Sequence, residues 1–234
     1  MYIYGKNVVR ESLISNDKIH KAYISNHFHD KELVDMLKNK RIKINYVDNR
    51  VLDRKVDGMH QGIVLEVDDI NIYTLDEFLK VVKDKKNALV VMLDHLEDPH
   101  NFGAIIRTSE ALGVDGIIIP DDRCVGITST VVKVSAGAIT HIPIIRVSNL
   151  YSSIEKLKKN NFWIVGTDMD GDDYTEIDYD MSICLVIGNE GHGLSKIVRD
   201  NCDYIASIPM KGKINSLNAS VSCGIILSRI VSCR

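Results

Sequence analysis

The sequence predicts an α/β protein whose larger, C-terminal part is built on a parallel sheet, and two patterns lead to this prediction. Apolar runs of strand length alternate there with helical patterns, as expected for a parallel sheet that is buried on both faces. A smaller N-terminal segment also alternates helix and strand. It is separated from the rest by a polar bridge and a helix-starting signal at residues 74–77.

In the N-terminal segment, helices are expected at residues 5–15 and 30–40, and strands at residues 20–25, 42–47 and 61–67. In Thr74-Leu75-Asp76-Glu77 the Thr and Glu form a capping box, in which each side chain satisfies the other's end of a new helix. A boundary near residues 68–74 therefore divides the chain into domains 1–70 and 71–234.

In the second domain, apolar runs predict strands at residues 88–93, 116–120, 142–147, 162–167 and 183–188. A helix is expected at residues 102–112, where Asn101 is a natural N-cap, and another at 150–159. The last helix, at about residues 218–231, is apolar enough to pack inward.

Composition indicates an ordinary globular protein, with 45% hydrophobic and 26% charged residues among 234. The longest apolar runs are far shorter than a membrane span, and the first residues lack the apolar core of a signal peptide. We therefore expect a cytoplasmic protein with no membrane partner. Five scattered cysteines include no C-x-x-C pair, so the sequence predicts no metal site.

Net charge gives no support for a nucleic-acid partner. The whole chain carries 29 Lys and Arg against 32 Asp and Glu, a balance of −3. Residues 1–70 carry 12 against 11, a balance of +1, and residues 71–234 carry 17 against 21, a balance of −4. Nucleic-acid binding would therefore need a local basic patch, because the overall charge does not attract phosphates.

Three loops that follow predicted strands carry unusual chemistry, at the edge of a parallel sheet where ligands bind. Residues 93–108 contain Asn101 and Arg107, which are six positions apart and so do not share one helix face. Residues 186–195 carry glycines in a G-x-x-G-x-G spacing that differs from the dinucleotide motif. Residues 208–221 form a turn rich in hydroxyl and amide groups that leads into an apolar helix.

Together these loops resemble the SpoU (TrmH) family of SPOUT RNA methyltransferases. The three signature blocks occur in order: N-x-G-x-x-x-R-T at 101–108, G-x-E-x-x-G-L-S at 188–195 and I-P-M-x-G-x-x-x-S-L-N-x-S-V at 208–221. The N-terminal segment is similar to the RNA-binding domain of RlmB-like members, through Y-G-x-x-x-V at 4–9 and His60-Gln61-Gly62-Ile63.

The resemblance implies a SPOUT-type parallel sheet with a C-terminal trefoil knot, preceded by a small α/β, ribosomal-protein-like RNA-binding domain. It also implies S-adenosylmethionine as methyl donor and a homodimer in which both subunits build each site. The implied reaction is methylation of a ribose 2′-hydroxyl in RNA, with a guanosine of 23S ribosomal RNA as the first hypothesis.

The resemblance also assigns residues to roles. The implied cofactor site uses backbone around Ile187, Gly188, Ile208, Met210, Leu217 and Asn218. The implied catalytic set is Arg107, Asn101, Glu190, Ser216 and Asn218. Candidates for RNA contact in the first domain are Lys6, Arg10, His60 and Gln61.

Arg107 has two possible roles in activating the hydroxyl. As a base it would have to lose its proton, and lowering an arginine pKa from about 13 to about 7 costs roughly 8 kcal/mol. As a permanently charged group it would instead clamp a neighbouring phosphate and favour the 2′-oxyanion.

Two other functions fit parts of the pattern. A transfer-RNA 2′-O-methyltransferase would keep the same chemistry with another substrate. A catalytically silent RNA-binding scaffold would not need S-adenosylmethionine, and the intact signature residues argue against it.

Overall fold

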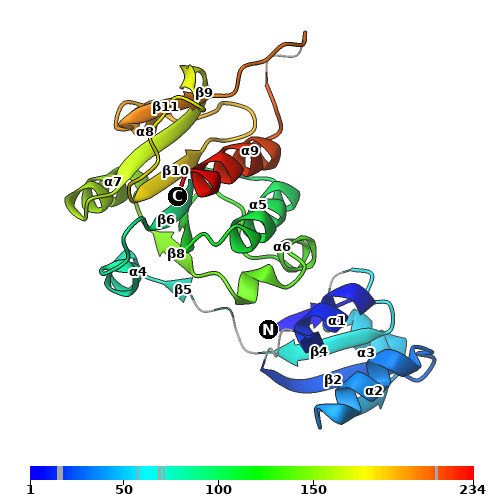
Figure 1. Ribbon diagram of the computed structural model, residues 1–234. Helices are drawn as coiled ribbons and strands as arrows, with labels where there is room; N and C mark the ends of the chain where they lie inside the picture. Colours follow the sequence, from blue (N-terminus) through cyan, green and yellow to red (C-terminus); the bar gives the residue numbers. More distant parts are fainter. Residues whose placement is uncertain (15–17, 57, 68–69, 71, 214–215) are drawn as a thin grey trace.

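A computed structural model describes residues 1–14, 18–56, 58–67, 70, 72–213 and 216–234 of the chain. It contains a four-stranded sheet and a seven-stranded sheet, which lie in the lower and upper parts of Figure 1. The last strand of the first sheet ends at Val67 and the first strand of the second begins at Ile72. The expected domain boundary at 68–74 falls partly on residues outside the described ones.

The first sheet has the order β1-β4-β2-β3, with β1 at Tyr2–Tyr4, β2 at Ile19–Ser25, β3 at Lys43–Val47 and β4 at Ile63–Val67. Strands β2 and β3 are parallel, and β4 runs antiparallel to β1 and β2. Helices α1 (Lys6–Ile14) and α2 (Lys31–Asn39) contribute Leu13 and Leu37 to the buried cluster on one face. The short α3 (Asn49–Asp53) buries Leu52 against Tyr4 and Val64 on the other face.

The second sheet has the order β11-β9-β10-β6-β7-β8-β5, and every strand pairing in it is parallel. This confirms the predicted parallel α/β architecture. Its strands are β5 (Ile72–Tyr73), β6 (Leu89–Leu93), β7 (Gly116–Pro120), β8 (Ile144–Val147), β9 (Trp163–Asp173), β10 (Ile183–Ile187) and β11 (Tyr204–Ser207).

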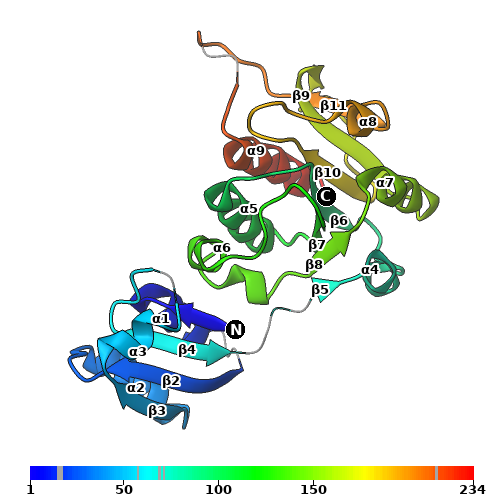
Figure 2. The ribbon, with the colours of Figure 1, turned by 180° about the vertical axis from the view of Figure 1, so that it is seen from behind.

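Helices cover both faces of this sheet, as the two views in Figures 1 and 2 show. Helices α5 (Pro99–Ala111), α6 (Ser129–Val134) and α9 (Ala219–Ser232) pack on the face that carries Val91 and Leu93. A 3₁₀ turn, Ala138–Thr140, follows α6. Helices α4 (Leu75–Val82), α7 (Leu150–Lys159) and α8 (Lys196–Arg199) pack on the face that carries Val90 and Met92. Neighbouring strand residues point to opposite faces, and helices bury both faces. The strands are therefore continuous apolar runs in the sequence.

The helix after β6 begins earlier than predicted, and Asn101 is not its N-cap. Asp98 is the N-cap: its carboxylate accepts a hydrogen bond from the backbone N–H of His100 at 3.0 Å, and Pro99 occupies the first helical turn. Proline is well suited to that position because the N–H that it lacks would have no helical partner. Asn101 is therefore a buried residue inside the first turn of α5.

The expected capping box at α4 is present, with Thr74 and Glu77 each bonded to the other's backbone. No described helix has both the length and the apolar composition that a membrane span requires.

Candidate active site

A cavity of about 1020 Å³ lies beside the middle of β9 and the ends of β10 and β11, where the loops that follow β10 and β11 begin. This is the carboxyl edge of the parallel strands, where α/β proteins bind ligands. The cavity draws its walls from four segments of the C-terminal domain. They are 167–170, 187–193, 206–210 and 216–219, together with Ser222 and Ile226 of α9.

The structure brings the predicted cofactor residues together at this cavity. All six of them line it: Ile187, Gly188, Ile208, Met210, Leu217 and Asn218. Glu190 and Ser216, from the predicted catalytic set, line the same cavity. Two apolar side chains of its wall are substantially exposed, Met210 at 38% and Leu217 at 40%.

The loop after β10 folds tightly back on itself beneath the cavity. Asn189 and Gly193 exchange two backbone hydrogen bonds of 2.9 Å, and Gly193 has a φ of +67°. A Cβ atom at Gly188 would lie only 2.3 Å from the carbonyl carbon of Gly193 and 2.5 Å from the nitrogen of Leu194. Glycine is therefore required at 188 by the close approach of backbone to backbone.

A chain of hydrogen bonds joins the three signature loops. The Glu190 carboxylate accepts from the Asn101 side-chain amide at 3.0 Å and from the backbone N–H of Asp98 at 3.2 Å. The Asn101 Oδ1 atom accepts from the Asn218 side-chain amide at 2.8 Å. Since a carboxylate accepts only, these partners fix which end of each amide faces which neighbour. Asn218 also caps α9, accepting from the backbone N–H of Ser220 at 2.9 Å.

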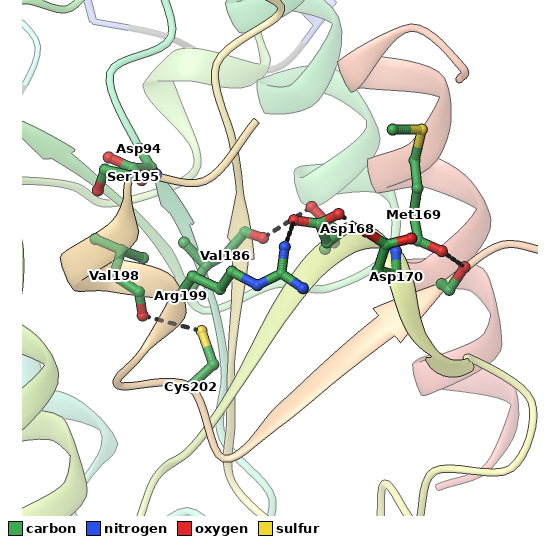
Figure 3. Close-up of polar contacts among 11 residues, drawn as sticks. Asp94, Asp168, Met169, Asp170, Val186, Ser195, Val198, Arg199 and Cys202 are labelled. Atoms are coloured by element: carbon green, nitrogen blue, oxygen red, sulfur yellow. Dashed lines mark hydrogen bonds and ion pairs between the residues drawn. The ribbon is translucent and has the colours of Figure 1, made fainter. Parts of the chain in front are cut away.

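Asp94 provides a second link between the first two loops, and the sequence analysis did not single it out. Its side chain is buried, with 1% exposed, and accepts a hydrogen bond from the backbone N–H of Ser195 at 2.6 Å (Figure 3). The His95 Nδ1 atom lies 2.6 Å from its other oxygen. The sequence does contain one indication of this role, because Asp94 is the first polar residue after an apolar strand.

The wall formed by residues 167–170 of β9 is held by polar contacts with α8 and β11. Figure 3 shows Arg199 reaching from α8 to the Asp168 carboxylate, with which it forms an ion pair. The Ser207 hydroxyl of β11 donates to the Met169 carbonyl at 2.8 Å. Asp168 and Met169 both line the cavity, and neither was predicted to do so.

The nearby thiol of Cys202 is not suited to nucleophilic chemistry. It contacts the Val198 carbonyl at 3.3 Å (Figure 3). Burial raises the pKa of Cys202 to about 12. The thiolate is the reactive form, and at neutral pH this group stays protonated.

Arg107 stands apart from the other predicted catalytic residues. It is exposed on α5 and does not line the cavity. Within the described part of the chain, no hydrogen bond or ion pair involves its side chain. One copy of the chain therefore assembles Asn101, Glu190, Ser216 and Asn218 without Arg107.

The predicted RNA-contact residues lie in the N-terminal domain. Lys6, His60 and Gln61 line one cavity of about 510 Å³. Arg10 does not line it and instead forms an ion pair with Glu32, with a distance of 2.5 Å between the guanidinium nitrogen and the carboxylate oxygen.

Replacing Asn218 by Ala is expected to destabilise the protein by about 1 kcal/mol, the usual cost of losing an N-cap, and to lower the melting temperature by about 2–4 °C. Asn218→Ser is the matched control because serine keeps a capping oxygen but lacks the side-chain amide that donates to Asn101. In thermal unfolding, the melting temperature of Asn218→Ser should lie close to that of the natural protein. Equal melting temperatures for the alanine variant and the natural protein would contradict the capping role.

Comparisons with known proteins show the family of this chain. Residues 88–228 match the SpoU rRNA Methylase family, and residues 2–73 match the family described as RNA 2′-O ribose methyltransferase substrate binding. A TrmH family tRNA/rRNA methyltransferase of Bacillus subtilis, YacO, is 41% identical over 98% of this chain and 94% of its own length. One of Staphylococcus aureus (strain COL) is 42% identical over 97% and 94%.

Two solved structures are similar over nearly the whole chain. The SpoU methyltransferase AviRb of Streptomyces viridochromogenes, in complex with AdoMet, superposes with a TM-score of 0.79 at 25% identity, covering 99% of this chain and 89% of that one. An AdoMet-bound rRNA methyltransferase of Sinorhizobium meliloti gives 0.75 at 25% identity, covering 98% and 85%. With these matches and the three linked signature loops, the chain belongs to the SpoU rRNA methylase family of TrmH-type RNA methyltransferases.

Proposed function

We propose that this protein transfers a methyl group from S-adenosylmethionine to a ribose 2′-hydroxyl of RNA, and that the acceptor is a guanosine of 23S ribosomal RNA. The proposal depends most on the hydrogen bonds from Asn101 to Glu190 and from Asn218 to Asn101. They connect all three signature loops, and Glu190 and Asn218 line the same cavity. The matched substrate-binding family over residues 2–73 supports the ribose oxygen as the acceptor.

The cavity fits S-adenosylmethionine, which is the cofactor. An adenine ring needs an apolar slot with backbone donors and acceptors close by. The exposed side chains of Met210 and Leu217 supply apolar walls, and the missing side chain at Gly188 lets the backbone form the floor. When bound, the cofactor supplies an electrophilic methyl group on a sulfonium.

The chain's own residues have to orient the acceptor and its proton. Glu190 already accepts hydrogen bonds from the backbone N–H of the N-cap residue Asp98 and from the Asn101 side chain, so we assign it as a positioning residue that fixes Asn101. Asn101 is buried and is not part of the cavity lining, so it acts by holding the Asn218 amide in place at the cavity wall, where Ser216 adds a hydroxyl. Orientation of this kind is the main source of rate in a displacement whose transition state disperses charge.

The location of Arg107 supports a homodimer in which the partner subunit's Arg107 completes each site. An arginine that is exposed on α5 and absent from its own cavity is available to a second copy. Its guanidinium then acts either as the base or as a charged clamp on a neighbouring phosphate. The trefoil knot, the cytoplasmic location and the domain limits 1–70 and 71–234 remain predictions from the sequence.

Incubation with labelled S-adenosylmethionine and either deproteinised 23S ribosomal RNA or transfer RNA tests the choice of substrate. Label in the ribosomal RNA alone is the expected result, and label in the transfer RNA alone would replace the substrate with the alternative one. A silent scaffold would label neither RNA and would show no heat of binding when titrated with S-adenosylmethionine.

A further inference from the structure

The N-terminal domain has its own cavity of about 510 Å³, which falls within the roughly 300–1,000 Å³ range of small-ligand pockets. Three loops surround it. They are the turn from β1 into α1, the turn from β2 into α2 and residues 58–62, which precede β4. This cavity is lined by residues of the N-terminal domain, whereas the candidate active site is lined by residues of the C-terminal domain. The methyl-transfer site therefore does not account for it.

The loops are held together and preorganised. Gln61 Oε1 accepts from the backbone N–H of Lys6 at 2.8 Å, and the Gly62 carbonyl accepts from the N–H of Ser25 at 2.8 Å. Gln61 and Gly62 have φ values of +53° and +82°. A left-handed conformation costs a non-glycine residue roughly 1–2 kcal/mol, so the contacts around Gln61 offset strain at the cavity rim.

One side of the cavity combines an aromatic ring with a cation. The Lys6 ammonium lies 5.1 Å from the centroid of the half-buried Phe28 ring. Met59 is 76% exposed beside them, although it is a large apolar side chain. A ring, a flexible thioether and a lysine are the groups on which an unpaired base can stack while its phosphate meets a positive charge.

The other side is polar and of mixed charge. The His60 Nδ1 atom accepts from the backbone N–H of Gly62 at 2.9 Å, so the ring's Nε2 carries the proton and donates to Asp53 at 3.0 Å. Lys6 also lies 3.6 Å from the Asp30 carboxylate. Nearby carboxylates disfavour a run of phosphates, whereas a single neutral base with polar edges suits this surface.

We propose that this cavity binds one unpaired nucleobase of the substrate RNA, stacked on Phe28 and Met59 beside the Lys6 ammonium. The exposed His27 and His29 stand at the rim, where the neighbouring nucleotides would pass. Single-stranded loops are the parts of RNA whose bases are free to leave the stack. The proposal rests on the proposed function, since it takes RNA to be the substrate, and it adds where an unpaired base of that RNA is held.

The test compares full-length variants for binding of deproteinised 23S ribosomal RNA by filter retention. Phe28→Leu keeps apolar volume but removes the ring, and Met59→Ala removes an exposed side chain that the fold does not need. Loss of one stacked base is expected to weaken binding by about 5- to 150-fold. Phe28→Tyr should bind like the natural protein because it keeps the ring. The matched control is Tyr46→Ala, which removes a 58% exposed aromatic side chain of β3 that does not line the cavity.

A perfectly paired RNA duplex serves as the second probe, and the Phe28→Leu and Met59→Ala variants should bind it as the natural protein does. If Phe28→Leu proves unfolded by thermal unfolding, Met59→Ala alone decides. Ribosomal RNA binding within about twofold of the natural protein for both folded variants would overturn the nucleobase site. That result leaves the methylation proposal intact if the natural protein still labels RNA. A natural protein that neither binds nor labels RNA would instead refute the proposed function.

Discussion

Gly188→Ala is expected to weaken S-adenosylmethionine binding by about 5- to 150-fold. The added Cβ would lie 2.3 Å from the backbone of Gly193, and neither strand β10 nor the tight loop can move away cheaply. Overpacking of this kind costs about 1–3 kcal/mol or more, and here the loop that must shift is the cavity floor. Isothermal titration with S-adenosylmethionine measures the effect.

Gly191→Ala is the matched control in the same loop. A Cβ at Gly191 meets its nearest neighbour, the Asn189 side-chain oxygen, at 3.4 Å, which is close to an ordinary contact. This variant should bind the cofactor within a few-fold of the natural protein. Equal affinities for Gly188→Ala and the natural protein would show that this loop does not form the binding floor.

Arg107→Ala is expected to lower the rate of methyl transfer by about 100- to 10,000-fold while leaving cofactor affinity unchanged. The range is that of losing either a proton-transfer group or an electrostatic clamp. Cofactor affinity should hold because Arg107 does not line the cavity of its own chain. Single-turnover methylation and titration calorimetry measure the two effects separately, and Arg107→Lys tests whether charge alone restores the rate.

Subunit mixing tests whether Arg107 acts across a dimer. Arg107→Ala has an intact cavity, and Gly188→Ala has an intact Arg107, so each variant alone should be strongly impaired when S-adenosylmethionine is kept below saturation. Random mixing makes roughly half of all dimers hybrid, each with one complete site if the sites are shared. Activity that reappears on mixing supports the shared site. If Arg107→Ala alone retains near-normal methylation with cofactor bound, its catalytic assignment is wrong.

The sequence predicted local features of the fold well where a single pattern dominated. The strand Gly116–Pro120 and the helix Leu150–Lys159 have their predicted limits, because an uninterrupted apolar run and a clear amphipathic repeat define them. Strand β9 instead continues to Asp173, well past its apolar run. Its polar half pairs with β11 after a register shift, and no local pattern reports such a distant partner.

In the candidate site, too, residues with a local sequence pattern were predicted, and residues whose role depends on a distant partner were not. Residues in the glycine-rich and amide-rich loops were assigned through the resemblance to the family's motifs, and close backbone approach and capping explain why glycine and asparagine stand there. Asn101 was identified as important but for the wrong local reason, since Asp98 caps the helix and Asn101 bridges Glu190 to Asn218. Asp94 was missed because its role depends on Ser195, about a hundred positions away.

The central claim is that the methyl group goes to a ribose oxygen, and the alkali stability of the product tests it most directly. The protein first labels RNA with methyl-labelled S-adenosylmethionine, and the RNA is then hydrolysed with alkali. Alkaline hydrolysis cleaves a phosphodiester only where the neighbouring 2′-hydroxyl is free. Methylation of the ribose oxygen predicts that the label is recovered in alkali-resistant dinucleotides. Recovery of the label in mononucleotides would place the methyl group on a base and would contradict the account.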